Sequence, residues 1–112
     1  MNAEKAAIYC RISREDEQKK DESESIQNQR AMLQEYAQSQ GWDVYETYVD
    51  EDYSGADSAR PAFLRLINDA QQRRFSVVLC KTQSRFTRDM ELVEEYIHRK
   101  FLLWGIRFVA VV

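Results

Sequence analysis

Short apolar runs mark three positions along the chain where strands are expected. Residues 5–12 are rich in Ile, Tyr and Cys, and residues 106–112 are similarly apolar. Residues 75–80 are apolar almost throughout, which is typical of a strand covered on both faces. The pattern therefore predicts three strands, one of them fully buried.

A fourth stretch, residues 42–49, alternates between apolar and polar positions. Val44 and Tyr48 are apolar, and polar residues lie beside them. This alternation favours a strand with one wet side, at an edge of the sheet. The segment DEDYSGADSARP follows it and is predicted to be a loop, because Asp, Ser and Gly favour turns.

Apolar residues three or four positions apart predict three helices. The first begins near Ser25, with Ser23 or Ser25 as its cap, and Gly41 ends it. Pro61 fits the first turn of the second helix, and Gly105 ends the third. The apolar stripes consist of Ile26, Leu33, Tyr36 and Ala37 in the first helix, Phe63, Leu64, Ile67 and Ala70 in the second, and Met90, Val93, Ile97, Phe101 and Trp104 in the third.

The predicted order of elements is β-α-β-α-β-α-β, with polar loops at 14–24 and 81–89. Such alternation predicts an α/β fold of three layers, in which a mostly parallel sheet has helices on both faces. Ligand sites in such sheets lie beyond the carboxyl ends of the strands. The residues that directly follow each strand are therefore the first candidates for function.

Composition restricts the function classes further. The chain has 112 residues, 44% of them hydrophobic and 31% charged, which indicates one folded domain. Its net charge of -3 excludes a polycation that coats DNA along its whole surface. No apolar run approaches the roughly 18–20 residues of a membrane span, and the start lacks the apolar stretch of a signal peptide. Two distant cysteines form no metal-type pair, and they suit a reducing cytoplasm.

Hydroxyl and guanidinium groups follow the first and third predicted strands. Arg11 and Ser13 are two positions apart at the end of the first strand, and Arg85 and Arg88 share a helical face after the third. If these strands are neighbours, one hydroxyl meets three arginines, an arrangement suited to phosphoryl transfer. The alternative interpretation is a surface serine, with arginines that face solvent or pair with the abundant acids.

Other chemistry finds little support in the sequence. His98 is the sole histidine and falls in a predicted helix, so a Ser-His-Asp triad is poorly supported and a surface position is expected. Metal-binding and P-loop motifs are absent from the sequence, and the Arg five positions after Cys80 misses the spacing of a cysteine phosphatase loop. Cys10 and Cys80 are expected to be buried strand residues.

Four short segments follow one another along the chain. They are YCRIS at 9–13 (Y-x-R-x-S), SIQNQ at 25–29 (S-I/L-x-x-Q), SGADSARP at 54–61 (S-G-x(4)-R-P) and KTQSRFTR at 81–88 (K-x-x-D/S-R-L/F-x-R). Together they resemble the serine recombinases, the resolvase and invertase superfamily. Three features look more like the large serine recombinases, which are phage-type integrases and mobile-element transposases. These features are the S-I-x-x-Q form, the R-P form and the acidic insert before them.

The resemblance implies a function for particular residues. Ser13 would be the nucleophile that attacks a DNA phosphodiester, leaving a 5′-phosphoserine link and a free 3′-hydroxyl. Phosphate contacts would come from Arg11, Arg85 and Arg88, and supporting contacts from Gln29, Ser54 and Arg60. No metal or cofactor is implied. The implied partners are double-stranded DNA at specific recombination sites and further copies of the chain, as a homodimer or tetramer of the full-length protein.

This sequence also departs from the family pattern. Many relatives carry Asp where this chain has Ser84, and nearby Asp89 is a candidate substitute. Family catalytic domains continue into another strand and a long dimerisation helix, followed by a DNA-binding region. We therefore expect residues 1–112 to form a single catalytic domain that is truncated at its C-terminus, and the isolated fragment to be inactive.

Two rival functions remain open at this point. One is a degenerate recombinase domain that serves only as an interaction module. The other is a phosphate-binding, receiver-like module, which would need an acidic cluster such as Asp50 and Asp52 at the strand ends. Arg11 beside Ser13 is out of place in a receiver-like site.

Overall fold

A four-stranded, wholly parallel sheet forms the centre of the protein. The computed structural model describes residues 4–13, 26–52, 60–87 and 89–112. The strands are β1 (Lys5–Ser13), β2 (Asp43–Asp52), β3 (Val77–Cys80) and β4 (Arg107–Ala110), in the order β2-β1-β3-β4. All neighbours pair in parallel, which confirms the predicted sheet and the edge position of β2. The strands β1 and β3 are neighbours, which is the condition for their C-terminal residues to lie close together.

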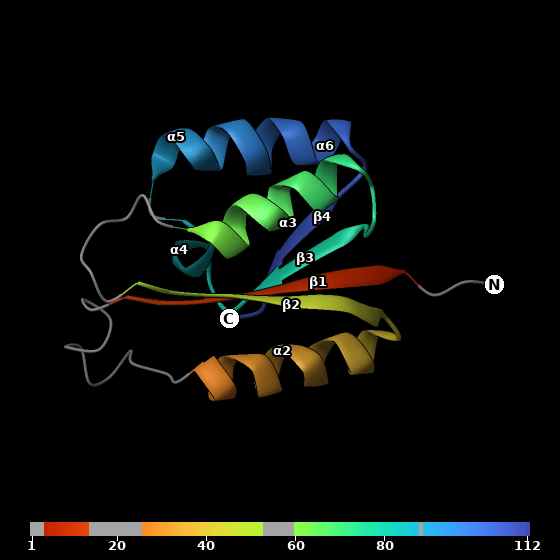
Figure 1. Cartoon of the computed structure of the whole chain (residues 1–112). Helices are drawn as coiled ribbons and strands as arrows, with labels where there is room; N and C mark the ends of the chain where they lie inside the picture. Colours follow the sequence, from red (N-terminus) through yellow and green to blue (C-terminus); the bar gives the residue numbers. More distant parts are fainter. Residues whose placement is uncertain (1–3, 14–25, 53–59, 88) are drawn as a thin grey trace.

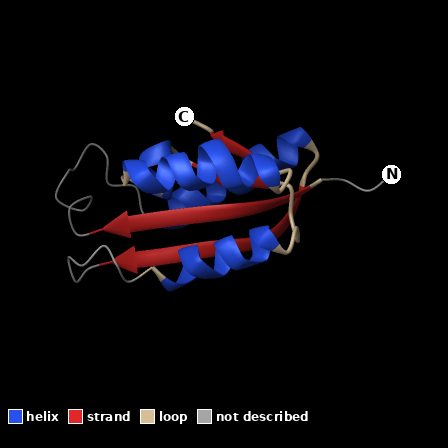
Figure 2. Ribbon diagram, turned by 90° about the horizontal axis from the view of Figure 1, so that it is seen from above, coloured by secondary structure: helices blue, strands red, loops and turns tan. Residues whose placement is uncertain are grey.

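Helices cover both faces of the sheet, as the alternating pattern predicts. The helix α2 (Ile26–Gln40) lies against one face, and α3 (Pro61–Gln71) lies on the other with a second, longer helical segment (Figures 1 and 2). That segment consists of α5 (Met90–Leu92), η1 (Val93–Lys100) and α6 (Phe101–Leu103). Gly41 and Gly105 follow α2 and α6 with φ of 75° and 71°, a left-handed conformation that costs glycine little.

The apolar core is split by the sheet into two clusters. On the α3 side the core is aromatic, with Phe63, Phe86 and Phe101 among its buried members. On the α2 side, Leu33 and Ala37 pack against the aliphatic residues of β1 and β3. All four residues of β3 are buried, which is why its sequence is continuously apolar. The cysteines of β1 and β3 are buried and free, as expected.

The predicted alternation of β2 is interrupted by a bulge. Ala6 pairs with Val44 and Ala7 with Glu46, so Tyr45 is an extra residue between them. Because one extra residue shifts the faces, Val44 is 38% exposed although Tyr48 is fully buried. The strand also continues to Asp52, so the first residues of the predicted loop belong to the sheet.

Parts of the predicted helical stripes are wrong. Leu64 is 66% exposed, and Leu66 takes its place in the buried face of α3. Met90 is 63% exposed, and the segment after it is a π-helix, a wider turn that the 3.6-residue spacing does not anticipate. The predicted loop 81–89 contains a short helix, α4 (Gln83–Phe86). The predictions for loop 14–24, and for Ser23 or Ser25 as a cap, lie outside the described residues.

The strand β1 extends further than its neighbour β3. Its ladder with β3 runs from Ala6 and Val77 to Ile8 and Leu79, whereas its ladder with β2 continues to Ser13. The helix α4 follows β3 and contacts the far end of β1. This arrangement places the carboxyl end of β1 between β2 and α4.

Candidate active site

The side chain of Arg11 binds the main chain of α4. Its Nε donates to the oxygen of Arg85 over 3.2 Å, and its Nη2 donates to the oxygen of Ser84 over 2.7 Å. Carbonyls at the end of a helix lack partners within the helix and carry partial negative charge, so a guanidinium is well suited to them. Arg11 is buried by this contact.

Arg60 approaches the same helix from the start of α3. Its Nη2 donates to the oxygen of Phe86 and, over 3.0 Å, to the hydroxyl of Tyr9. Its Nε lies 3.3 Å from the same hydroxyl, and its guanidinium carbon lies 4.0 Å from the centre of the Phe63 ring. Three consecutive carbonyls of α4, those of residues 84–86, therefore accept hydrogen bonds from arginines outside the helix.

Asp50 connects β1, β2 and α3. Its carboxylate accepts from the amides of Ala62 (3.0 Å) and Phe63 (2.9 Å) and from the hydroxyl of Tyr9 (2.7 Å). Arg60 stands at the N-cap position of α3 without capping it through its side chain, so Asp50 caps the helix from the sheet. Burial raises the pKa of Tyr9 well above its ordinary value; the charge of Arg60 lowers it, and the hydrogen bond to Asp50 raises it again.

Gln29 reaches the site from the opposite face of the sheet. It is fully buried in α2, and its Nε2 donates to the main-chain oxygen of Arg11 over 3.2 Å. This bond ties α2 to the strand residue two positions before Ser13. The structure thus brings together Arg11, Gln29, Arg60 and Arg85 of the predicted site, with Arg85 buried in α4.

The residues around the family's acidic position have local partners. Ser84 is exposed, and its hydroxyl lies 3.0 Å from that of Thr82. The carboxylate of Asp89 accepts from the amide of Glu91 over 2.9 Å and caps α5, while its own amide donates to the hydroxyl of Thr87. Asp89 is therefore used as a helix cap in this structure, and its role as a substitute carboxylate stays a prediction.

Three predicted site residues are not described in full. The backbone of Ser13 ends β1 opposite Asp52, and its side chain lies outside the described part. Ser54 and Arg88 lie outside the described residues altogether. Their proposed contacts with phosphate stay predictions.

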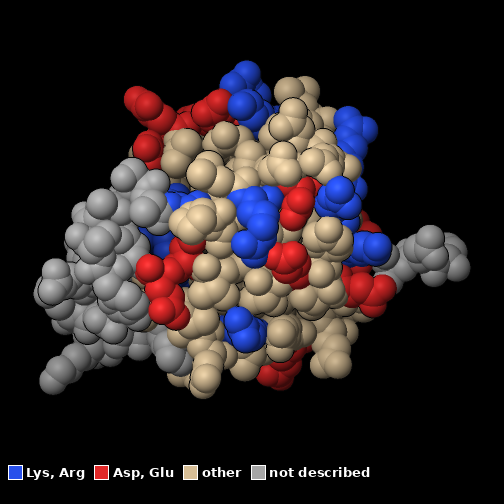
Figure 3. All heavy atoms as spheres, viewed as in Figure 1, with Lys and Arg blue, Asp and Glu red and all other residues tan. Residues whose placement is uncertain are grey.

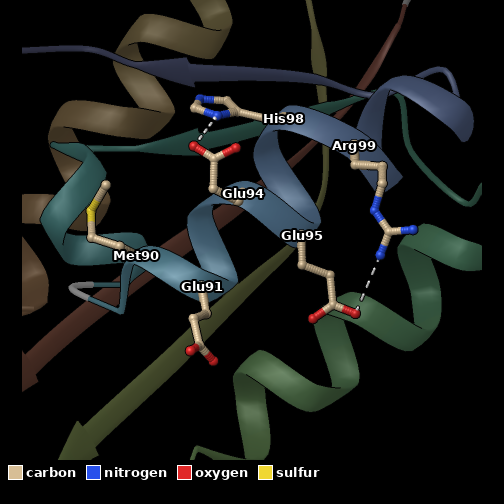
Figure 4. Close-up of a pocket in the computed structure, with 6 residues that line it drawn as sticks. All are labelled: Met90, Glu91, Glu94, Glu95, His98 and Arg99. Carbon is tan, nitrogen blue, oxygen red and sulfur yellow. Dashed lines mark hydrogen bonds and ion pairs between the residues drawn. The ribbon is translucent and has the colours of Figure 1, made fainter.

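Charges of both signs are distributed over the described surface. In the view of Figure 3, basic and acidic side chains are mixed rather than gathered into one basic patch. A shallow groove on the helix formed by α5 and η1 is mainly acidic (Figure 4); its lining consists of Met90, Glu91, Glu94, Glu95, His98 and Arg99. His98 is exposed, as expected, and its Nδ1 lies 3.1 Å from Glu94. The carboxylates of this groove would repel an anionic ligand.

In the described parts of the chain, no three His, Cys, Asp or Glu side chains converge in a way that could hold a metal ion. Within the same residues, no helix combines the length and the apolar character that crossing a bilayer requires.

The family model described as "Resolvase, N terminal domain" matches residues 6–111 of the chain. The chain belongs to the resolvase family. Among solved structures, the resolvase-family chain is similar to the N-terminal catalytic domain of TP901-1 integrase, with 34% identity and a TM-score of 0.80 over 96% of this chain and 76% of that one. The catalytic domain of ISC1926 TnpA, an IS607-like serine recombinase, has 30% identity and a TM-score of 0.73 over 96% and 70%.

Two other proteins extend the comparison. A resolvase family site-specific recombinase from Streptococcus pneumoniae shares the fold, with 23% identity and a TM-score of 0.77 over 96% of this chain and 71% of that one. "Uncharacterized immunity region protein 3" of Bacillus phage phi105 is 40% identical over 65 residues, which cover 58% of this chain and 77% of that protein. Family membership and fold together identify this chain as a site-specific serine recombinase catalytic domain.

The sequence analysis gave no role in the recombinase site to two residues that lie beside Arg60. Tyr9 is only a member of the Y-x-R-x-S segment there, and Asp50 lies in a predicted loop after a strand, yet in the structure they form a buried hydrogen bond next to Arg60. The signals that could have found them are the polar end of a core tyrosine and an acid at the end of a strand.

Proposed function

We propose that Ser13 is the nucleophile of this recombinase and forms a covalent 5′-phosphoserine link with DNA. Support comes from one arrangement: near the carboxyl end of β1 the buried side chain of Arg11 binds the main-chain oxygen of Arg85, itself buried, and the backbone of Ser13 ends that strand. Guanidinium groups suit phosphate oxygens and keep their charge at any working pH. Arg88 follows on the same segment of chain and would complete the phosphate contacts.

In the proposed step, the Oγ of Ser13 forms a bond to phosphorus and the bond from phosphorus to the 3′-oxygen breaks. The serine proton passes to solvent water, and the departing 3′-oxygen takes up a proton to become a hydroxyl. The arginines stabilise the added negative charge of the transition state, because fixed donors in a partly buried site need no reorganisation. One phosphodiester replaces another, so the reverse reaction can rejoin strands after exchange without a metal or cofactor.

The proposal extends to partners and setting. Strand exchange requires double-stranded DNA at specific recombination sites and more than one copy of the active site, which a homodimer or tetramer of the full-length protein would supply. Support for the DNA partner comes from the family match, and support for a cytoplasmic setting comes from the two free, buried cysteines.

The alternative of a receiver-like module loses its main support. Asp50 already accepts three hydrogen bonds within the fold, two of them from the start of α3. A carboxylate used in this way is poorly placed to hold a metal-bound phosphate.

The test is a search for the covalent adduct. The protein at its natural length is incubated with duplex DNA that is nicked near the crossover, so that the cleaved state is trapped. We expect a nucleotide linked to the peptide that contains Ser13, and no adduct with Ser13→Ala. DNA binding without any adduct would reject the assignment and favour the degenerate domain.

A further inference from the structure

Two tyrosines on neighbouring strands make similar bonds in different settings. Tyr9 of β1 and Tyr48 of β2 are register partners, and both side chains are buried. Tyr9 donates to Asp50 over 2.7 Å, and Tyr48 donates to Asp69 over 2.6 Å. The settings differ in one respect: the hydroxyl oxygen of Tyr9 also accepts two hydrogen bonds from Arg60.

The Tyr9 hydroxyl has a single proton, and Asp50 fixes where it points. Asp50 is itself held by the amides of Ala62 and Phe63, so its carboxylate has little freedom to turn. With the proton directed to Asp50, the lone pairs of the tyrosine oxygen are the acceptors for Arg60. The buried pair of Tyr9 and Asp50 therefore sets the direction of the Arg60 guanidinium.

Arg60 transmits this direction to α4. Its Nη2 donates both to Tyr9 and to the main-chain oxygen of Phe86, the last residue of α4. The residue before Phe86 is Arg85, whose own carbonyl accepts from Arg11. A continuous series of hydrogen bonds thus runs from the N-terminus of α3 through Asp50, Tyr9 and Arg60 to the helix that carries Arg85.

We propose that Tyr9 is a positioning residue of the recombination site, which with Asp50 aims Arg60 at α4 and so fixes the place of Arg85. This inference rests on the proposed function, since it assigns Arg85 to the phosphate. A four-residue helix cannot hold its position through its own hydrogen bonds, so contacts from outside must do so. Electrostatic stabilisation of a transition state depends on donors that are already in place.

The experiment compares Tyr9→Phe with Tyr48→Phe in the protein at its natural length. Both changes remove one buried hydroxyl from a tyrosine–aspartate pair, so the second controls for lost stability. For each variant, the rate of Ser13 adduct formation and the affinity for DNA are measured separately. The NMR resonance of the Arg60 Nε–H and the hydrogen exchange of the α4 amides are measured as well.

Tyr9→Phe is expected to slow adduct formation about tenfold with DNA affinity unchanged, as for a lost hydrogen bond to a charged group. It should also shift the Arg60 resonance and speed exchange in α4, whereas Tyr48→Phe should change neither. In a background of Arg60→Ala, Tyr9→Phe should add no further slowing, because both act through one series of bonds.

Equal effects of the two tyrosine changes on rate and on α4 exchange would overturn the proposal and leave Tyr9 a purely structural residue. An unshifted Arg60 resonance in Tyr9→Phe would do the same. If the unchanged protein forms no adduct on Ser13, the proposed function fails, and the NMR arm still decides whether Tyr9 positions Arg60 and α4.

Discussion

The side-chain nitrogen of Gln29 in α2 lies 3.2 Å from the main-chain oxygen of Arg11 in β1, across the sheet from α4. Arg11 is therefore held on both sides, by α2 at its backbone and by α4 at its guanidinium. The backbone that leads into Ser13 has its position fixed by elements of two different layers.

Replacing Gln29 with Leu should loosen this backbone contact. The change leaves the Arg11 carbonyl without this donor in a buried place, so the free energy of unfolding should fall by about 1–2 kcal/mol. Urea unfolding measures the loss, and adduct formation should slow several-fold. Gln34→Leu, an exposed position on the same helix, is the matched control and should change stability by less than about 0.5 kcal/mol. A similar loss for both variants would contradict the assignment.

Arg11→Lys should be far from conservative. A lysine ammonium is a compact charge and cannot reproduce the planar fork that reaches the oxygens of Ser84 and Arg85 together. We expect adduct formation to fall by about 10²-fold or more, the loss typical of one transition-state donor. Single-turnover kinetics on nicked DNA measures it, with Arg30→Lys on the exposed side of α2 as the control. A near-normal rate would show that the guanidinium fork is not needed.

Asp50→Asn should destabilise the fold strongly. The asparagine side chain offers one acceptor oxygen where the carboxylate serves three donors, and its NH₂ group would face an amide or a hydroxyl. The free energy of unfolding should fall by about 3 kcal/mol, measured by denaturant titration. Asp69→Asn should cost less, about 1 kcal/mol, since Asp69 is less buried and binds the single hydroxyl of Tyr48 together with a long contact to Arg74. An equal cost at the two positions would count against the capping role of Asp50.

The protein should lose stability in alkali. Burial raises the pKa of Cys10 from 9.0 to about 12 and raises that of Cys80 well above 9.0. Below pH 9 both thiols are protonated in the folded and unfolded chain, so they add no pH dependence. Above pH 9 the unfolded chain loses these protons first, and stability falls as the pH rises toward the folded pKa values. Urea midpoints at pH 8, 9.5 and 10.5 should decrease in that order, and less steeply in Cys10→Ala; a flat profile would contradict the burial of these thiols.

The strands, their parallel arrangement and the edge position of β2 were predictable because each depends on a pattern of several residues. The continuous apolar run at 75–80 can be satisfied only by a strand with both faces covered, and β3 is such a strand. The glycines after α2 and α6 mark the helix ends because few other residues tolerate their left-handed conformation.

Features that depend on one residue or on a distant contact were not predictable. The extra residue Tyr45 reverses the faces of β2, and the propensities of its neighbours do not signal it. The helix α4 lies in a polar segment without an apolar stripe, and its main-chain oxygens are bound by arginines from elsewhere in the chain. The sequence resemblance identified Arg11, Gln29, Arg60 and Arg85 as a group, but not that two of these arginines bind the main chain of α4.

The unequal length of the two β1 ladders bears on how this family can diversify. Past Ile8, the ladder of β1 with β3 has ended in the described residues, and β1 continues beside β2 alone as a two-stranded ribbon. On the side toward α4, side-chain contacts such as those of Arg11, rather than a strand, adjoin the carboxyl end of β1. Exchange of a few of those side chains can therefore change the surroundings of that strand end while the hydrogen-bonded frame of the sheet stays as it is.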